Sequence, residues 1–139
     1  MHVETADAVA VRDGSEVGAD PGREPVVVGV VRSPPAWFRQ RVDVSYPAVG
    51  LPEDLSADLD RRRRDLRMQG LCEEGAHNAA WEELDVDGQY RASLSDEPAR
   101  TVLSSLVSMQ GLPVLATDRR PGFRCHREVL ARVLRDRDG

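Results

Sequence analysis

The sequence predicts an α/β fold: a compact three-layer domain with a small, mostly parallel sheet flanked by helices. Two short apolar runs, VVVGVV at 26–31 and PVLAT at 113–117, have the composition of buried strands. Helical patterns separate the two runs, and strands that alternate with helices are typical of a parallel sheet. At 139 residues, we expect a single domain over 1–139.

The N-terminal residues 1–25 are loosely patterned. Residues 3–11 favour a first strand, and the Gly-, Asp- and Pro-rich residues 13–25 favour a surface loop. The core is expected over 26–139. Its residues 32–52 contain four prolines and Gly50, which predicts an irregular segment.

A long helix is predicted over 53–69, because Leu55, Leu59 and Leu66 share one face. Gly70 suits the position after its end. Arginines at 61–64 follow acidic residues four positions earlier, so we expect exposed pairs of Asp58 with Arg62 and of Asp60 with Arg64. This interleaving favours a solvated helix face over a nucleic-acid-binding run.

Four further helical segments complete the expected fold. Short helices are predicted over 77–85 and 87–94, and a longer one over 96–110, capped by Ser95. The last helix is expected over 125–136. The predicted buried stripes of the last two helices are Val102, Leu103, Leu106 and Val107, and then Val129, Leu130, Val133 and Leu134.

The charge balance argues weakly against bulk nucleic-acid binding without excluding it. The chain has no lysine, 19 arginines and 24 acidic residues, for a net charge of −5. This composition is halophile-like, which is a hypothesis about its source. No run is long enough to span a membrane and no signal peptide is apparent, so we expect a cytoplasmic protein with reduced cysteines. The pattern carries no prediction of oligomeric state.

A parallel sheet would bring candidate site residues together at the edge formed by the carboxyl ends of its strands. Ligands of such sheets bind outside the carboxyl ends of the strands. The strand at 26–31 leads into Arg32, and the strand at 113–117 leads through a loop to Cys125. If both strands are parallel, Arg32 and Cys125 lie along the same edge.

Cys125, His126 and Arg127 stand together at a predicted helix start. The helix dipole and nearby arginines favour the thiolate of Cys125, which is the reactive form of cysteine. His126 is a candidate base, although adjacent helical residues point about 100° apart. The alternative is that Cys125 is a small buried residue and His126 a surface one.

The same loop can also be interpreted as an anion site. Gly122 permits a concave arrangement of backbone amides, and Arg32, Arg124 and Arg127 could hold a phosphate or carboxylate. The partner would be an anionic small molecule, with no covalent step required. Alternatively, these arginines pair with Asp118 or Glu128.

Two other groups of residues have the composition of a site. Cys72, His77, Cys125 and His126 are the residue types of a zinc site, but their spacing is poor, so no metal and no cofactor is expected. In the segment 73–83, His77 could be a base oriented by an acidic neighbour, with Asn78 and Trp81 as binding residues. The alternative there is a capped amphipathic helix with a core tryptophan.

Three stretches, VVVGVVRSPPAWF, MQGLCEEGAHNAAWEEL and PVLATDRRPGFRCHREVLARVL, resemble the uncharacterised family known as domain of unknown function 488, and within it the haloarchaeal members. The resemblance covers residue 26 to the end, and it is most specific at Cys125–His126–Arg127 and then at Arg32–Pro35. It implies a compact α/β domain that brings the two motifs together, and it implies no established activity.

One departure from that family narrows the possibilities. Similar members carry a Leu–Cys–x–Glu stretch after the last strand, where this chain has Leu115–Ala116–Thr117–Asp118. Chemistry with two thiols at this place is therefore not expected. The sequence favours an enzyme acting on an anionic or phosphorylated small molecule, with Cys125 as nucleophile and His126 or His77 as acid or base. A non-catalytic module that binds an anion, a nucleotide or a nucleic-acid end is the alternative.

Overall fold

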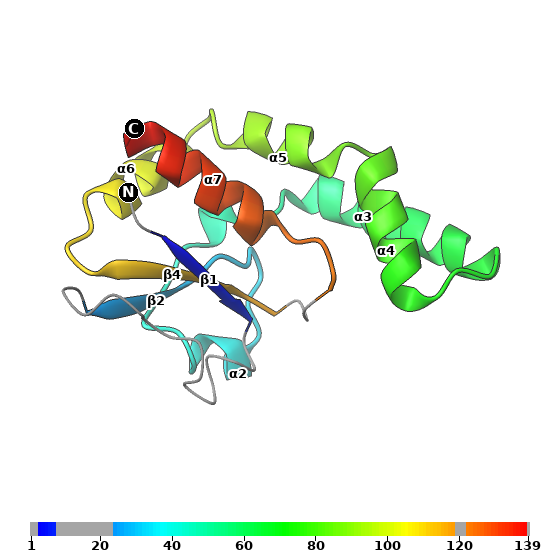
Figure 1. Ribbon diagram of the computed structural model, residues 1–139, viewed down its shortest axis with the longest axis horizontal. Coiled ribbons are helices and arrows are strands. Elements are labelled where there is room, and N and C mark those ends of the chain that lie inside the picture. The colour runs from blue at the N-terminus through cyan, green and yellow to red at the C-terminus, as the bar shows by residue number, and fades with distance from the viewer. Residues whose placement is uncertain (1–2, 8–23, 119–121, 139) are drawn as a thin grey trace.

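A computed structural model describes residues 3–7, 24–118 and 122–138 of the chain. Its sheet has four strands, β1 (Glu4–Asp7), β2 (Pro25–Gly29), β3 (Val44–Ser45) and β4 (Leu112–Thr117), in the order β1-β4-β2-β3. All neighbouring strands run parallel (Figure 1). The predicted α/β class with a parallel sheet is confirmed.

Helices cover both faces of this sheet. Side chains alternate along its central strands, so each face carries apolar side chains that need a covering layer. Val28 and Leu115 face a large core that includes Leu130 of α7 (His126–Asp138). Val27 and Ala116 face the other way and pack against Phe38 of the short helix α2 (Ala36–Arg39). The helices α5 (Val86–Ser93) and α6 (Ala99–Val107) lie with α7 on the larger side (Figure 1).

The segment 32–52 is more regular than its prolines predict. It contains α2, the two-residue strand β3 and a 3-10 turn over Pro47–Val49. β3 pairs with β2 through Val28 and Val44, which places it at an edge of the sheet. Two residues are too few to show strand alternation, so the sequence pattern could not reveal this strand.

The long helix is confirmed as α3 (Glu53–Met68), with Leu55, Leu59 and Leu66 buried. Gly70 follows it with φ +107°, and the amides of Gly70 and Leu71 close the last turn. The expected spacing of the ion pairs is wrong. Pairs form at i,i+3 instead, between Asp58 and Arg61 at 3.2 Å and between Asp60 and Arg63 at 3.1 Å.

Two predicted helix starts are also wrong. α4 (Glu73–Glu83) begins before residue 77, because the Cys72 sulfur accepts a hydrogen bond from the Gly75 amide and caps the helix. α6 begins at Ala99, after Pro98, and Ser95 does not cap it. A residue that precedes proline is disfavoured in the helical conformation, so Glu97 cannot extend the helix backwards.

The remaining expectations hold within a few residues. The predicted segment 87–94 is α5, and the last strand and helix are β4 and α7. Leu103, Leu106, Val129, Leu130 and Leu134 are buried, while Val102, Val107 and Val133 are half-buried. Residues 8–11 of the expected first strand and 13–23 of the expected loop lie outside the described residues. Within the described part, no helix is long and apolar enough to cross a membrane.

Candidate functional site

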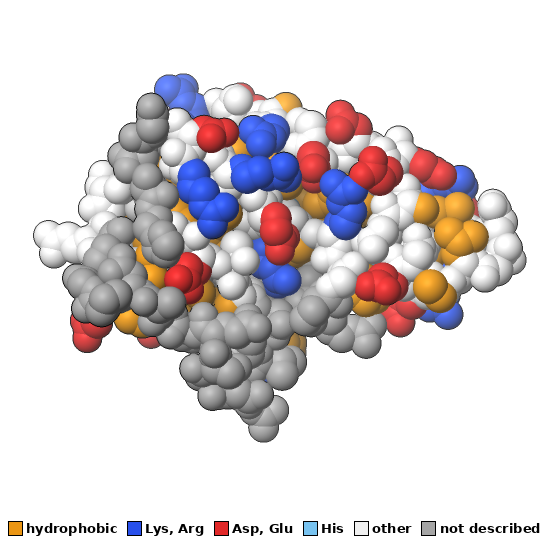
Figure 2. All heavy atoms as spheres, in the orientation of Figure 1, with side chains coloured by type: hydrophobic (Ala, Val, Ile, Leu, Met, Phe, Trp, Pro, Cys, Tyr) orange, Lys and Arg blue, Asp and Glu red, His pale blue; other side chains and the backbone are white. Residues whose placement is uncertain are grey.

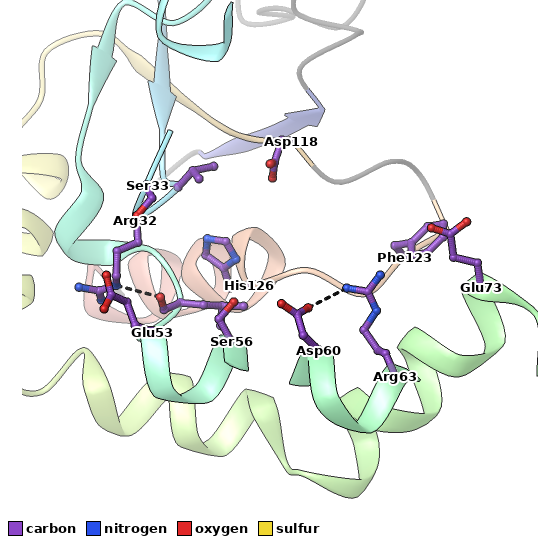
Figure 3. Close-up of a pocket in the computed structure, with 12 residues that line it drawn as sticks. Arg32, Ser33, Glu53, Ser56, Asp60, Arg63, Glu73, Asp118, Phe123 and His126 are labelled. Atoms are coloured by element: carbon purple, nitrogen blue, oxygen red, sulfur yellow. Dashed lines mark hydrogen bonds and ion pairs between the residues drawn. The ribbon is translucent and has the colours of Figure 1, made fainter. Parts of the chain in front are cut away.

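The carboxyl ends of β2 and β4 meet at one edge of the sheet, where Gly29 lies opposite Ala116. Beyond this edge is a cleft of about 440 Å³. Arg32 and Ser33 enter it from the end of β2, and Asp118 and His126 from the β4–α7 connection (Figure 3). The edge argument from the sequence therefore places Arg32 and the Cys125–His126 segment correctly.

The opposite wall of the cleft is one stripe of α3. Glu53, Ser56, Asp60 and Arg63 follow each other at helical spacings of three and four, and all four line the cleft (Figure 3). Sequence reasoning missed this wall, although the spacing was visible. A polar stripe is normally read as a solvated face, and only the folded chain shows that it faces the sheet edge.

Cys125 directly precedes the first residue of α7, and its side chain is buried at 3% exposed. The sulfur lies 3.7 Å from Nδ1 of His126 and 3.2 Å from Oγ1 of Thr117. The backbone N–H of Arg127 also donates a hydrogen bond to the sulfur. Although they are adjacent in sequence, Cys125 and His126 do contact each other.

The direction of each hydrogen bond follows from its partner. Nε2 of His126 lies 2.6 Å from the carbonyl oxygen of Val30, so it must donate, because a carbonyl only accepts. Nδ1 is then the nitrogen that can take the Cys125 proton. Arg127 Nη1 donates to Thr117 Oγ1 at 2.8 Å, and the threonine hydroxyl donates to the sulfur when Cys125 is a thiolate, which has no proton to give.

These contacts decide the ionisation of Cys125. Burial raises the pKa of the thiol. The positive charge of His126 and the hydrogen bonds from His126, the Arg127 amide and Thr117 lower it by more, so the net pKa of Cys125 lies below its ordinary value. The surroundings of the sulfur therefore favour a thiolate beside an imidazolium.

Tyr90 supports the histidine from behind and was not found by sequence reasoning. Its ring packs edge-on against His126, with 5.2 Å between ring centroids, and its hydroxyl donates to the Val49 carbonyl at 2.6 Å. Desolvation, with the negative charge of Cys125 adding to it, raises the pKa of Tyr90, so the phenol stays neutral. No signal in the sequence links residue 90 to residue 126.

Arg32 has a double role at the cleft. Its Nε and Nη2 donate to the carbonyl oxygens of Leu51 and Gly50, at 2.8 and 3.0 Å. A β-carbon on Gly50 would lie 2.4 Å from the Arg32 backbone nitrogen, so this close approach requires glycine. Arg32 forms no ion pair with a described residue, and its remaining nitrogen is available to a ligand.

Arg127, predicted to bind an anion, is instead a buried structural residue at 7% exposed. Its Nη1 donates to Thr117 and, at 3.2 Å, to the Ala6 carbonyl, and its Nε pairs with Glu128. These bonds tie α7 to β4 and β1. Arg127 does not line the cleft, and it reaches the site only through its amide and Thr117.

The residues His77 and Asn78 hold the loop that leads into Cys125. Asn78 donates to the Gly122 carbonyl at 3.0 Å and accepts from the Arg124 amide at 2.9 Å. His77 Nε2 donates to the Arg124 carbonyl at 2.7 Å and is fully buried. Neither residue lines the cleft, so the structure places both as supports of the loop.

Trp81 and Arg124 share a carboxylate. Trp81 is buried, and its Nε1 donates to Asp87 at 2.7 Å. The Arg124 guanidinium pairs with Asp87 at 3.3 Å and with Glu82. Arg124 is therefore engaged by acidic side chains of α4 and α5, as the alternative interpretation of the arginines required, although with different partners.

A second, smaller cavity of about 270 Å³ is lined by Cys125, Trp81, Phe123 and Arg124 among others. Phe123 lines both this cavity and the cleft. The Cys125–His126 pair thus lies between two hollows, with the histidine on the side of the cleft.

In the described part of the chain, no group of three or more His, Cys, Asp or Glu residues is placed to hold a metal ion. Both cysteines are free thiols, Cys72 exposed and Cys125 buried. Cys72 caps α4, and His77 is bonded to the loop backbone. Of the four residues with the chemistry of a zinc site, Cys125 and His126 contact each other, whereas Cys72 and His77 make separate contacts.

Comparisons with known proteins identify no relative of this chain. No family model matches the chain, and neither a curated protein nor a solved structure matches it. The function must therefore be argued from the site.

Proposed function

We propose that this chain is an enzyme that uses Cys125 as a nucleophile on a small polar molecule bound in the cleft. The observation that carries the proposal is the assignment of both ring nitrogens of His126. Nε2 is held by the Val30 carbonyl, and Nδ1 faces the sulfur. A nucleophile, its base and a group that orients the base are the parts of covalent catalysis.

The proposed reaction is a group transfer through the thiol. The Cys125 thiolate forms a bond to an electrophilic carbon of the substrate, and the bond from that carbon to the leaving group breaks. The leaving group takes the proton from Nδ1 of His126. Water then adds to the same carbon and gives a proton to Nδ1, and the restored thiolate departs with the bonding electrons of the carbon–sulfur bond.

The ligand would be held by the cleft itself. Arg32 offers an unpaired guanidinium nitrogen and Ser33 and Ser56 offer hydroxyls, while no other arginine predicted for anion binding lines the cleft. An anionic or phosphorylated substrate therefore stays a proposal that rests, within this cleft, on Arg32. Membership of the family known as domain of unknown function 488 belongs to the same proposal and adds no activity to it.

One observation favours a second candidate, a non-catalytic binding module. The Cys125 side chain is almost fully buried and lines the smaller cavity rather than the cleft, and its sulfur accepts a hydrogen bond from a backbone amide at the start of α7. A buried cysteine with these contacts can act as a helix cap alone. In that case the cleft would bind its ligand equally well without the thiol.

The deciding experiment is the pH dependence of alkylation by iodoacetamide. Cys72→Ser isolates Cys125, and Cys125→Ser gives the signal of Cys72 alone. We expect Cys125 to react with an apparent pKa below about 8.5, the value for an unperturbed thiol, and to return to that value in denaturant. His126→Asn should raise the apparent pKa again, since it removes the positive charge.

Two results would contradict the enzyme. Cys125 could be inert in the folded protein at every pH, or His126→Asn could leave its titration unchanged. Either result, together with a Cys125→Ser variant that is as stable as the wild type, would support the binding module.

A further inference from the structure

The polar stripe of α3 continues beyond the cleft. Asp60, Arg63 and Glu73 line the cleft and also a second groove of about 520 Å³, which Arg64 and Arg67 complete. Positions 60, 63, 64 and 67 lie on one face of a helix. The two hollows therefore adjoin each other along α3.

The two hollows differ in their charged groups. Near His126 the cleft is lined by Glu53 and Asp118, with Arg32 as the nearby cation (Figure 3). The groove is lined by three arginines, Arg63, Arg64 and Arg67, and by two carboxylates, Asp60 and Glu73. Cations therefore outnumber carboxylates in the groove, which favours an anionic group there.

The four-arginine run divides by partner. Arg61 pairs with Asp58 and Arg62 with Glu83, and neither lines the groove. Arg63 pairs with Asp60 at 3.1 Å. Arg64 forms no ion pair with any residue that the structure describes, and Arg67 reaches Glu73 only at 3.9 Å.

We infer that the substrate is an elongated small molecule whose phosphate or pyrophosphate end lies in the arginine groove, while its reacting end lies in the cleft. This inference rests on the proposed function and adds the class of its substrate. Guanidinium groups bind phosphate oxygens through paired, charge-assisted hydrogen bonds. Arg64 and Arg67 supply such donors without first breaking a short ion pair.

Over the face shown in Figure 2, a small group of basic side chains is flanked by acidic ones. A long polyanion such as duplex nucleic acid needs an extended basic surface. The arginine groove is local and adjoins the cleft, which suits the end of a small molecule.

The test is a titration of the intact protein with inorganic pyrophosphate, followed by calorimetry at low ionic strength. The chain offers a matched control in two exposed arginines outside the groove, Arg61 of α3 and Arg100 of α6. Arg64→Ala with Arg67→Ala removes two groove arginines, and Arg61→Ala with Arg100→Ala removes two exposed arginines outside it. We expect the groove variant to weaken pyrophosphate binding about tenfold or more, and the control to bind within about twofold of the wild type.

The inference is overturned if the wild type does not bind pyrophosphate, or if both double variants weaken binding equally, because the effect would then follow net charge alone. Its failure is separable from that of the enzyme. If Cys125 is inert while the groove result is as expected, the thiol chemistry fails and the groove stands. If Cys125 is reactive while pyrophosphate does not bind, the groove assignment fails.

Discussion

The two walls of the cleft are built in different ways. The wall formed by the end of β4 and the start of α7 is backed by a buried network, in which His126 contacts Cys125 and the Val30 carbonyl, and Thr117 bonds to Cys125 and Arg127. The wall formed by α3 is more exposed, and its Asp60 pairs with Arg63 one turn away.

This difference indicates which wall can hold a reacting group and which can adapt to a ligand. Long, exposed side chains lose rotamer freedom when they pair, so such pairs contribute little and reorganise easily. A buried network that is fully bonded has one arrangement, because any broken bond leaves an unsatisfied group. Under the proposed function, the first wall would hold the reacting groups and the second would adapt to the ligand.

The largest effect is expected from Arg127→Met, which keeps the length of the side chain and removes its donors. The Ala6 carbonyl and the Thr117 hydroxyl would each lose a charge-assisted partner, and we expect the free energy of unfolding to fall by about 3 kcal/mol. Chemical denaturation measures it. Arg135→Met is the control, since Arg135 is exposed and, among the described residues, donates to the Val3 carbonyl just before β1. Equal losses in both variants would contradict the special place of Arg127.

A smaller effect is expected from Asn78→Ala, which removes both bonds that clamp the loop before Cys125. We expect a loss of about 2 kcal/mol in the free energy of unfolding and a rise in the apparent pKa of Cys125 alkylation. Asn78→Asp keeps the acceptor for the Arg124 amide and should fall between the two. If stability drops while the alkylation profile stays fixed, Asn78 holds the fold and does not position the thiolate.

The smallest effect is expected from Arg61→Ala on the outer face of α3. Arg61 and its partner Asp58 are both more than half exposed, so the free energy of unfolding should stay within about 0.5 kcal/mol of the wild type. Thermal and chemical denaturation measure it. A cost near that of Arg127→Met would remove the contrast between the two walls.

The parts of the site that the sequence predicted are those that topology alone decides. Two apolar runs separated by helices implied parallel strands, and the rule for their carboxyl ends placed Arg32 near Cys125 and His126. The lowered pKa of Cys125 agrees with the expectation from its place before a helix, whereas its reactivity stays a prediction. These inferences need no knowledge of side-chain conformations.

What the sequence could not predict depends on tertiary contacts. Tyr90 meets His126 across a large separation along the chain, and Thr117 looks like the polar end of a strand until Arg127 orients it. His77 was read as a candidate base, but its ring is committed to the Arg124 carbonyl. Spacing in the sequence identifies residues whose side chains are chemically suited to a site. Their hydrogen-bond partners in the fold decide which of them are free to act there.

The hydrogen bond between Arg127 and the Ala6 carbonyl joins residues 121 positions apart, and Arg135 reaches Val3 over 132 positions. During synthesis, Cys125 and His126 emerge from the ribosome after every strand of the sheet. The Cys125 thiolate acquires its hydrogen-bond donors only when α7 packs against the sheet, whose strands have been synthesised earlier. A nascent chain that stalls before residue 125 would lack both the thiol and the groups that lower its pKa, so the chemistry proposed here depends on the docking of α7.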